Sequence, residues 1–205
     1  MNLQQLLNNP QLPDLEIHGL SEHTAEVEPG FGFIAVADSA ARVQQHCSAA
    51  VAAGAAVLLF DARFSLKTQY VVPCIPVPNL NDRRGALAAR FYGDPSKALT
   101  CIGVTGTNGK TSVAYHIADL GGRLGEITGY SGTVGWGCLR ILRHASMTTA
   151  NAVSLQRQLA DMLAAGAQGV ALEVRSHALA RDRARDGAGE SAGGGGRGDV
   201  RLSLI

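Results

Sequence analysis

The chain has 205 residues, of which 46% are hydrophobic and 17% are charged, and its formal net charge at pH 7 is +1. A chain of this length can bury the core of one large domain or of two modest ones. A net charge so close to zero gives no electrostatic reason to expect binding to nucleic acid or to an anionic membrane surface.

The cysteines and the N-terminal segment exclude several further classes of protein. Four cysteines lie far apart in the sequence and form no CxxC pair: Cys47, Cys74, Cys101 and Cys138. This spacing fits neither a zinc site nor a compact disulfide framework, and it favours free, buried thiols in a reducing cytosol. The N-terminus lacks the basic and apolar regions of a signal peptide, and no run of about 18 apolar residues could span a membrane. We therefore expect a cytoplasmic protein.

The first half of the chain alternates strand-like and helix-like segments. Short apolar runs predict strands at 31–36, 57–60 and 70–77, and helix-prone composition predicts helices at 40–53 and 79–92. Gly54 is positioned to end the first helix, because glycine readily adopts the left-handed conformation of a helix C-terminus.

The third strand and the second helix carry local signals of their own. Prolines at 73, 76 and 78 place the strand at a sheet edge or at its own end, because proline cannot donate a ladder hydrogen bond. Asn79 is the candidate N-cap of the helix that follows. We expect the three arginines of this helix on its outer face: Arg83, Arg84 and Arg90.

A turn cluster at 93–96 is the best candidate for a domain boundary, and the alternation restarts after it. The expected elements are a strand at 99–104, a loop at 106–109, a helix at 110–120, an amphipathic helix at 151–165 and a strand at 169–174. The second helix has the apolar set Val153, Leu155, Leu159, Met162 and Leu163. Strands separated by helices of this length predict parallel α/β sheets.

The C-terminal segment 181–205 has a different composition. It is rich in glycine and arginine and shows neither a helical nor a strand period. Such a segment cannot bury enough apolar surface to offset its ordering entropy, so we expect a disordered tail.

The segment GVTGTNGKT at 103–111 carries the chemistry of a phosphate site. Glycines at 103, 106 and 109 let the backbone turn its N–H groups toward an anion, and the helix N-terminus adds partial positive charge. Lys110 can reach the β- and γ-phosphates, and the Thr111 hydroxyl can bind magnesium. Val104 stands where the strict P-loop pattern has glycine, so this is a variant loop. The alternative, a glycine-rich turn with a surface lysine, is disfavoured by the flanking strand and helix.

Five motifs together resemble the Mur ligases, the ATP-dependent amide-forming enzymes of peptidoglycan precursor synthesis. They are GVTGTNGKT, ARFYGDPS at 89–96, LGEITGYSGTVG at 124–135, MTTANAVSLQRQL at 147–159 and ALEVRSHALARDR at 171–183. Within the family, the likeness is to the tripeptide synthetases (MurE). It is specific from 71 to 183 and looser from 15 to 70.

This resemblance implies a domain plan and a reaction. Residues 1–95 would form a small α/β domain that binds the UDP-sugar substrate. Residues 96–180 would form part of the central parallel-sheet P-loop ATPase domain. ATP would phosphorylate the terminal carboxylate of UDP-MurNAc-L-Ala-D-Glu. The amine of a diamino acid, meso-diaminopimelate or L-lysine, would then attack the acyl phosphate.

The resemblance also assigns roles to individual residues. ATP would be bound by Gly106, Thr107, Asn108, Gly109, Lys110, Thr111 and Ser112, with Lys110 as the catalytic residue. Thr111 and Glu173 would bind Mg²⁺, since carboxylate and hydroxyl oxygens suit a hard cation. The substrate would be bound by Thr24, Thr148, Thr149 and Arg183.

Each of these residues also has a plainer interpretation. Glu173 could be a solvated carboxylate at a strand end. Thr148 and Thr149 could be an ordinary loop pair, and Arg183 could belong to an exposed charge run. His177, in the same segment, is expected to be structural or simply exposed.

The chain also departs from the family pattern. Met147 replaces an asparagine, Arg175 a small hydroxyl residue and Arg181 a glutamine, while the uridine-site motif falls on 23–25, where only Thr24 keeps a hydroxyl. Family members are more than twice as long.

Three hypotheses about the function follow: a Mur ligase, a non-catalytic remnant that at most binds nucleotide, or another P-loop ATPase or folate-type ligase. The last usually reads GKGS where this chain has Lys110-Thr111-Ser112.

Overall fold

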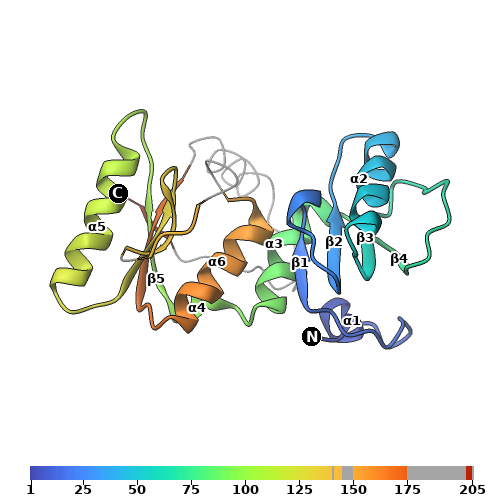
Figure 1. Cartoon of the computed structure of the whole chain (residues 1–205), viewed down its shortest axis with the longest axis horizontal. Coiled ribbons are helices and arrows are strands. Elements are labelled where there is room, and N and C mark those ends of the chain that lie inside the picture. Colours follow the sequence, from blue (N-terminus) through green and yellow to red (C-terminus); the bar gives the residue numbers. More distant parts are fainter. Residues whose placement is uncertain (140, 145–149, 175–201, 205) are drawn as a thin grey trace, which may run out of the picture. The chain divides into compact units, whose positions relative to one another are not determined.

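The computed structural model describes residues 1–139, 141–144, 150–174 and 202–204 (Figure 1). It divides into two compact units, one of Met1–Phe91 with Ala152–Ser154 and one of Tyr92–Asn151 with Leu155–Ile205. Over the described residues, no helix is both long enough and apolar enough to cross a membrane. Both units are α/β, as the alternation of strands and helices predicted.

The first unit is built on a four-stranded parallel sheet. Its strands follow the order β1 (Gly19–Ser21), β2 (Phe31–Ala35), β3 (Val57–Asp61) and β4 (Cys74–Val77). Its helical elements are α1 (Leu3–Leu7), the 3-10 turn η1 (Thr24–Glu26), α2 (Ala40–Ala52) and α3 (Leu80–Phe91). The main strands and helices that the sequence predicted are confirmed, whereas α1, β1 and η1 were not predicted.

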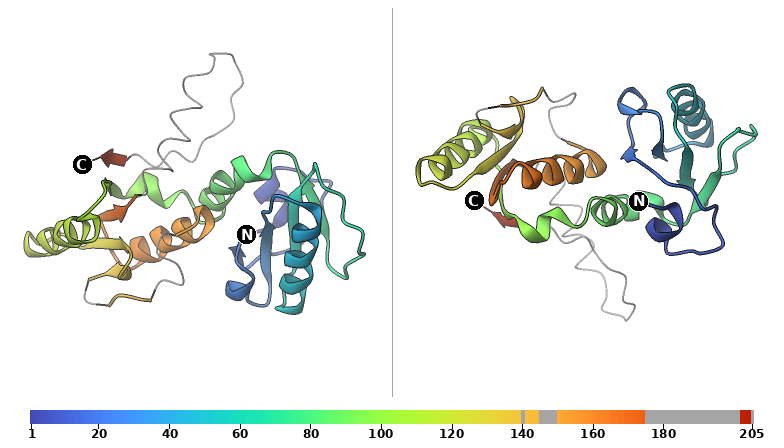
Figure 2. Two further views of the ribbon diagram at one scale, coloured as in Figure 1. Left: turned by 90° about the horizontal axis from the view of Figure 1, so that it is seen from above. Right: turned by 60° about the horizontal axis from the view of Figure 1, so that its bottom comes forward.

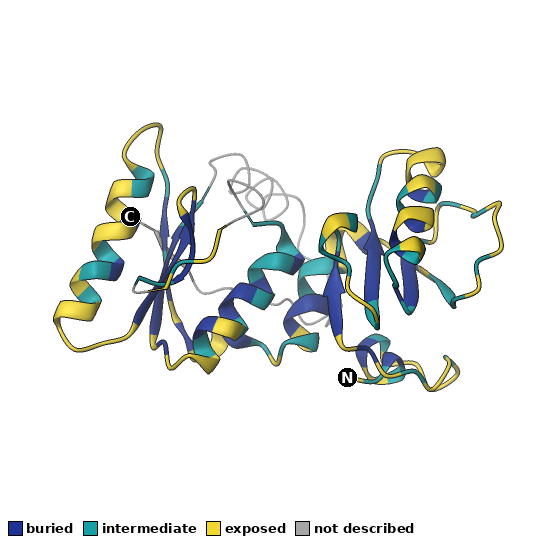
Figure 3. Ribbon diagram, viewed as in Figure 1, coloured by how far each residue is buried: buried dark blue, intermediate teal, exposed yellow. Residues whose placement is uncertain are grey.

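Side-chain alternation along the strands makes the core of this unit. Phe33 and Leu58 point from β2 and β3 onto one face, where they pack against Val43 and Cys47 of α2. Figure 3 shows the two strands as buried and the outer side of α2 as exposed. Gly54 has a φ of +99° and follows α2, as expected of a residue that ends a helix.

The start of the predicted third strand and the start of α3 differ from expectation. The strand begins only at Cys74, and it lies at the sheet edge as its prolines predicted. Asn79 adopts a left-handed φ of +53°, and the cap of α3 comes from elsewhere: the Leu80 backbone N–H donates to Asp61 Oδ2 at 3.1 Å. Asp61 is distant in sequence, so local capping signals did not reveal it.

The position of Arg84 also differs from the prediction. We expected it on the outer face of α3, but it is half-buried and lies 2.6 Å from Glu22, whose side chain is only 5% exposed. The pairing explains its burial, because a carboxylate that loses water needs a charged donor. Arg83 and Arg90 are exposed, as predicted.

The second unit holds a five-stranded sheet with the order β7-β6-β8-β5-β9. Its strands are β5 (Thr100–Val104), β6 (Thr128–Gly132), β7 (Gly135–Cys138), β8 (Gly169–Glu173) and β9 (Leu202–Leu204). Its helices are α4 (Pro95–Ala98), α5 (Lys110–Arg123) and α6 (Ala152–Ala164), the last of which begins in the stretch grouped with the first unit.

This sheet is mixed, which corrects the expectation of parallel strands throughout. Only two residues, Thr133 and Val134, connect β6 to β7, and a connection so short allows only an antiparallel hairpin. A second difference concerns the predicted disordered tail at 181–205. Within it, β9 pairs in parallel with β5, while 181–201 and 205 lie outside the described residues.

Helices α5 and α6 cover opposite faces of this sheet (Figures 1 and 2). Along β8, Val170 and Leu172 belong to the core cluster that contains Leu159 of α6. Ala171, between them, packs in the cluster that contains Ala114 of α5. The parallel pairing of β5 with β8 places their carboxyl ends side by side, and α5 begins at Lys110, shortly after the end of β5.

Candidate functional site

The connection between β5 and α5 has the backbone of an anion-binding loop. Gly106 and Gly109 have φ values of +145° and +79°, which side-chain-bearing residues rarely adopt. A Cβ at Gly109 would meet nothing within 4 Å, so conformation rather than crowding requires glycine there. The residues from Gly106 to Gly109 are exposed, and α5 begins at Lys110. The loop therefore presents a helix N-terminus to solvent, as a phosphate site requires.

Lys110 lies folded over this loop. Its Nζ donates to the Gly106 carbonyl oxygen at 2.8 Å and to that of Thr107 at 3.3 Å. The ammonium group is thus held over the loop residues for which the sequence predicted phosphate contacts. A neutral side chain here would leave the loop with only backbone dipoles to attract an anion.

Glu173 ends β8 and is paired in the sheet with Val104, the last residue of β5. Its carboxylate therefore lies beside the start of the loop. Thr111 Oγ1 donates to Glu173 Oε2 at 3.1 Å. The two residues that the sequence assigned to one metal site, 62 positions apart, are in direct contact. Parallel strands explain this, because their carboxyl ends meet at one edge of the sheet.

Three more donors bind the Glu173 carboxylate, and sequence analysis identified none of them. Thr133 donates its backbone N–H to Oε1 at 2.9 Å and its hydroxyl to Oε2 at 3.0 Å, and the Tyr130 hydroxyl donates to Oε1. Gly132 permits this approach, because a Cβ there would overlap Glu173. The short turn after β6 was the sequence signal for these donors. Because β6 pairs with β8 in parallel, this turn lies near the end of β8, where Glu173 stands.

These donors decide the charge of Glu173. Burial by itself would raise the pKa of this carboxyl, but the hydrogen bonds from Tyr130, Thr133 and Thr111 outweigh burial and hold the pKa below its ordinary value of 4.5. For Tyr130, burial and the hydrogen bond to Glu173 both raise the pKa of the phenol. At neutral pH, the site therefore presents an ionised carboxylate next to a hydroxyl.

This donor set fits magnesium better than a transition metal. It offers one carboxylate and one hydroxyl, both hard oxygen ligands. Nowhere in the described part of the chain do three or more His, Cys, Asp or Glu side chains gather as metal ligands. Magnesium sites commonly use only one or two protein ligands and take the rest from water and phosphate.

The predicted substrate-binding residues are only partly placed. Thr24 lies in η1, just after the carboxyl end of β1 in the first unit, and is half-buried. Thr148, Thr149 and Arg183 lie outside the described residues, as does His177. The structure thus brings together the predicted ATP and metal residues of the second unit and leaves the substrate assignments as predictions.

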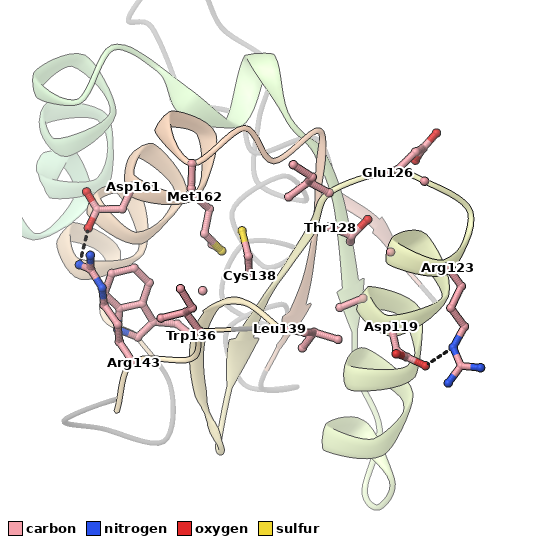
Figure 4. A pocket seen from close by; sticks show the side chains of 17 residues that line it. Asp119, Arg123, Glu126, Thr128, Trp136, Cys138, Leu139, Arg143, Asp161 and Met162 are labelled. Carbon is pink, nitrogen blue, oxygen red and sulfur yellow. Dashed lines mark hydrogen bonds and ion pairs between the residues drawn. The ribbon is translucent and has the colours of Figure 1, made fainter.

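A separate cavity of about 730 Å³ lies at the other end of α5 (Figure 4). It is lined mainly by the second half of α5, by β7 and by α6, and none of the predicted site residues lines it. The sole tryptophan, Trp136, forms part of its wall, with the Arg143 guanidinium 5.1 Å from the ring centroid and 3.3 Å from Asp161.

All four cysteines are free thiols, as predicted. Cys47 and Cys101 are buried, and Cys74 and Cys138 are half-buried.

Known proteins resemble this chain in both sequence and structure. Residues 104–188 match the Mur ligase middle domain. The UDP-N-acetylmuramoyl-L-alanyl-D-glutamate--2,6-diaminopimelate ligase of Alkalilimnicola ehrlichii is 38% identical over 190 residues, and that of Ectopseudomonas mendocina is 41% identical over 185 residues. These matches cover 88% and 89% of this chain. A solved structure of a ligase with the same name superposes with a TM-score of 0.68 at 29% identity, covering 89% of this chain and 37% of the other.

The chain spans about 38% of the length of these curated relatives. The matched middle-domain segment includes most of the phosphate loop, Thr111 and Glu173. On this sequence and structural likeness, the chain belongs to the Mur ligase family.

Proposed function

We propose that residues 106–112 and Glu173 bind ATP together with Mg²⁺, and that the chain forms the nucleotide-binding front part of a Mur ligase. That ligase would add diaminopimelate to UDP-MurNAc-L-Ala-D-Glu. The observation that carries the proposal is the contact of Thr111 with Glu173 beside an open glycine loop. The names of the relatives support diaminopimelate, rather than lysine, as the amino acid added.

The residues of this chain would bind and orient the nucleotide. The loop backbone and the N-terminus of α5 would hold the phosphates. Lys110 would leave the Gly106 and Thr107 carbonyl oxygens and turn to the γ-phosphate, where charge builds up during transfer. Glu173 and Thr111 would hold the magnesium ion, which when bound neutralises phosphate charge. Positioning and charge neutralisation would therefore be the main catalytic contribution of this region.

The ligation itself would follow the scheme that the family resemblance implies. The D-Glu carboxylate attacks the γ-phosphorus of ATP, giving an acyl phosphate and ADP. The amine of diaminopimelate then attacks the acyl carbon, and the tetrahedral intermediate collapses with loss of phosphate. Thr24, Thr148, Thr149 and Arg183 are the proposed contacts to the UDP-MurNAc peptide, in a reaction placed in the cytoplasm.

Nucleotide binding tests the proposed site directly. A fluorescent ATP analogue should bind the full chain, and Lys110→Ala should weaken binding by about 10- to 100-fold, the usual loss for a hydrogen bond to a charged group. Lys97→Ala is the matched control. Lys97 lies in α4 of the same unit, where it is mostly exposed and forms an ion pair with Asp94. Equal binding by wild type and Lys110→Ala would refute the loop assignment.

A second assay separates a ligase from a protein that binds nucleotide without ligating. The chain is incubated with ATP, UDP-MurNAc-L-Ala-D-Glu and meso-diaminopimelate while phosphate release is followed. Turnover on the order of 1 per second would establish an enzyme. Nucleotide binding without turnover would support the alternative, a non-catalytic remnant.

A further inference from the structure

The two oxygens of Glu173 have different kinds of partners. Oε1 accepts a backbone N–H from Thr133 at 2.9 Å and the Tyr130 hydroxyl. Oε2 accepts only side-chain hydroxyls, from Thr111 at 3.1 Å and from Thr133 at 3.0 Å. A backbone N–H cannot turn away from its acceptor, whereas a threonine hydroxyl can rotate to another. Oε1 is thus the anchored oxygen, and Oε2 is the oxygen that can be released to a cation.

Tyr130 is placed so that its hydroxyl serves this anchoring. Its ring is fully buried, packed in the cluster with Val104 and Ala114 under α5. The surroundings of the ring are apolar, so phenylalanine would suit them equally well. The hydroxyl accepts from the Val134 backbone N–H at 3.4 Å and donates to Glu173. A buried phenol requires a partner, and here its donor is directed at the carboxylate.

We propose that Tyr130 is a positioning residue for the nucleotide-bound magnesium: its hydroxyl, together with Thr133, fixes Glu173 so that Oε2 faces Thr111 Oγ1. This inference rests on the proposed function, because it concerns the same metal site. Magnesium demands near-ideal octahedral geometry, so rotational freedom in either protein ligand weakens its binding. Hydrogen-bond partners behind a metal ligand commonly change metal affinity by about 10- to 100-fold.

The test compares nucleotide binding with and without the metal. Dissociation constants of a fluorescent ATP analogue are measured for the full chain in excess Mg²⁺ and in EDTA, and their ratio defines the metal gain. Tyr130→Phe removes one oxygen atom and should lower the metal gain by about 10-fold. Its dissociation constant in EDTA should stay within about twofold of wild type, because the Tyr130 hydroxyl bonds to Glu173 and Val134, whereas Lys110 bonds to the loop carbonyl oxygens.

Tyr115→Phe is the matched control. The two rings lie edge to face with centroids 5.9 Å apart, and Tyr115 is 38% exposed on α5. Its metal gain should equal that of wild type. Thr133→Val removes one hydroxyl donor and keeps the backbone N–H, so it should lower the metal gain less than Tyr130→Phe does. Thr133→Ser, which restores the hydroxyl, should recover the wild-type value.

The outcomes are distinguishable. A loss confined to the metal gain in Tyr130→Phe supports the positioning role, and if that variant does not fold, the pair Thr133→Val and Thr133→Ser decides. An unchanged metal gain, or equal losses with Mg²⁺ and with EDTA, would overturn it while leaving the proposed function intact. A wild-type chain that gains nothing from Mg²⁺ would overturn the metal site itself, and this inference with it.

Discussion

Asp61 and Glu173 occupy equivalent places in the two sheets, since each is the last residue of a parallel strand. The Asp61 carboxylate accepts backbone N–H groups from Arg63 at 3.0 Å and from Leu80 at 3.1 Å, and so fixes a turn and caps α3. Glu173 instead accepts three hydroxyls and one N–H beside a glycine loop. A carboxylate at a strand end is therefore not a metal site by position alone. Its donors and the neighbouring loop decide its role.

Removing each carboxylate in turn tests the difference between Asp61 and Glu173. Glu173→Ala should remove the gain in nucleotide affinity that Mg²⁺ provides, by about 100-fold, because the proposed metal site loses its carboxylate. Asp61→Ala should leave nucleotide binding unchanged and destabilise the fold by about 1 kcal/mol, as expected for a lost helix cap. Binding of the ATP analogue and urea unfolding measure the two effects. An Asp61→Ala variant with impaired metal gain would contradict the distinction drawn between the two residues.

The pH dependence of stability provides a smaller test of the Glu173 environment. Its folded-state pKa is lowered relative to the ordinary value of 4.5, because its hydrogen bonds outweigh its burial. A lowered pKa stabilises the folded state above the ordinary pKa, and this stabilisation is lost as pH falls through the lowered value. Urea unfolding of wild type and Glu173→Gln between pH 7 and pH 3 should show the two midpoints converging at the acid end. Midpoints that keep a constant separation would contradict the assignment.

A final prediction, with a smaller effect, concerns the reactivity of the cysteines. Each of the two units contains one buried and one half-buried cysteine. Burial raises the pKa of Cys47 to about 12, with a contribution from Cys74, and that of Cys101 to about 11. These thiols should therefore react with an aromatic disulfide reagent only after unfolding, since the thiolate is the reacting form. Cys74 and Cys138 should react first in the native state. Labelling followed by peptide mass analysis distinguishes the sites, and modification of Cys47 in α2 before Cys74 in the native state would contradict this order.

Much of the fold followed from local patterns. The strand at 31–36, the helix at 40–53 and the helix start at Lys110 were predicted because apolar runs, helix-prone composition and glycine stops act over a few residues. The antiparallel strand β7 was missed because the turn before it is only two residues long and lies among glycines. The strand at 202–204 was missed because three residues of β pattern carry no signal until a neighbouring strand pairs with them.

The residues of the chain were enough to predict a phosphate loop, since glycines, a lysine and a threonine follow one another between a strand and a helix. The sequence also proposed Glu173 as the partner of Thr111, through the family resemblance. The surroundings of that carboxylate became visible only in the folded sheet. Tyr130 and Thr133 reach it because β6 pairs with β8 and the hairpin turn folds toward the strand end. The contact between Thr133 and Glu173, 40 positions apart, depends on which strands become neighbours in the sheet, and a local pattern does not specify those neighbours.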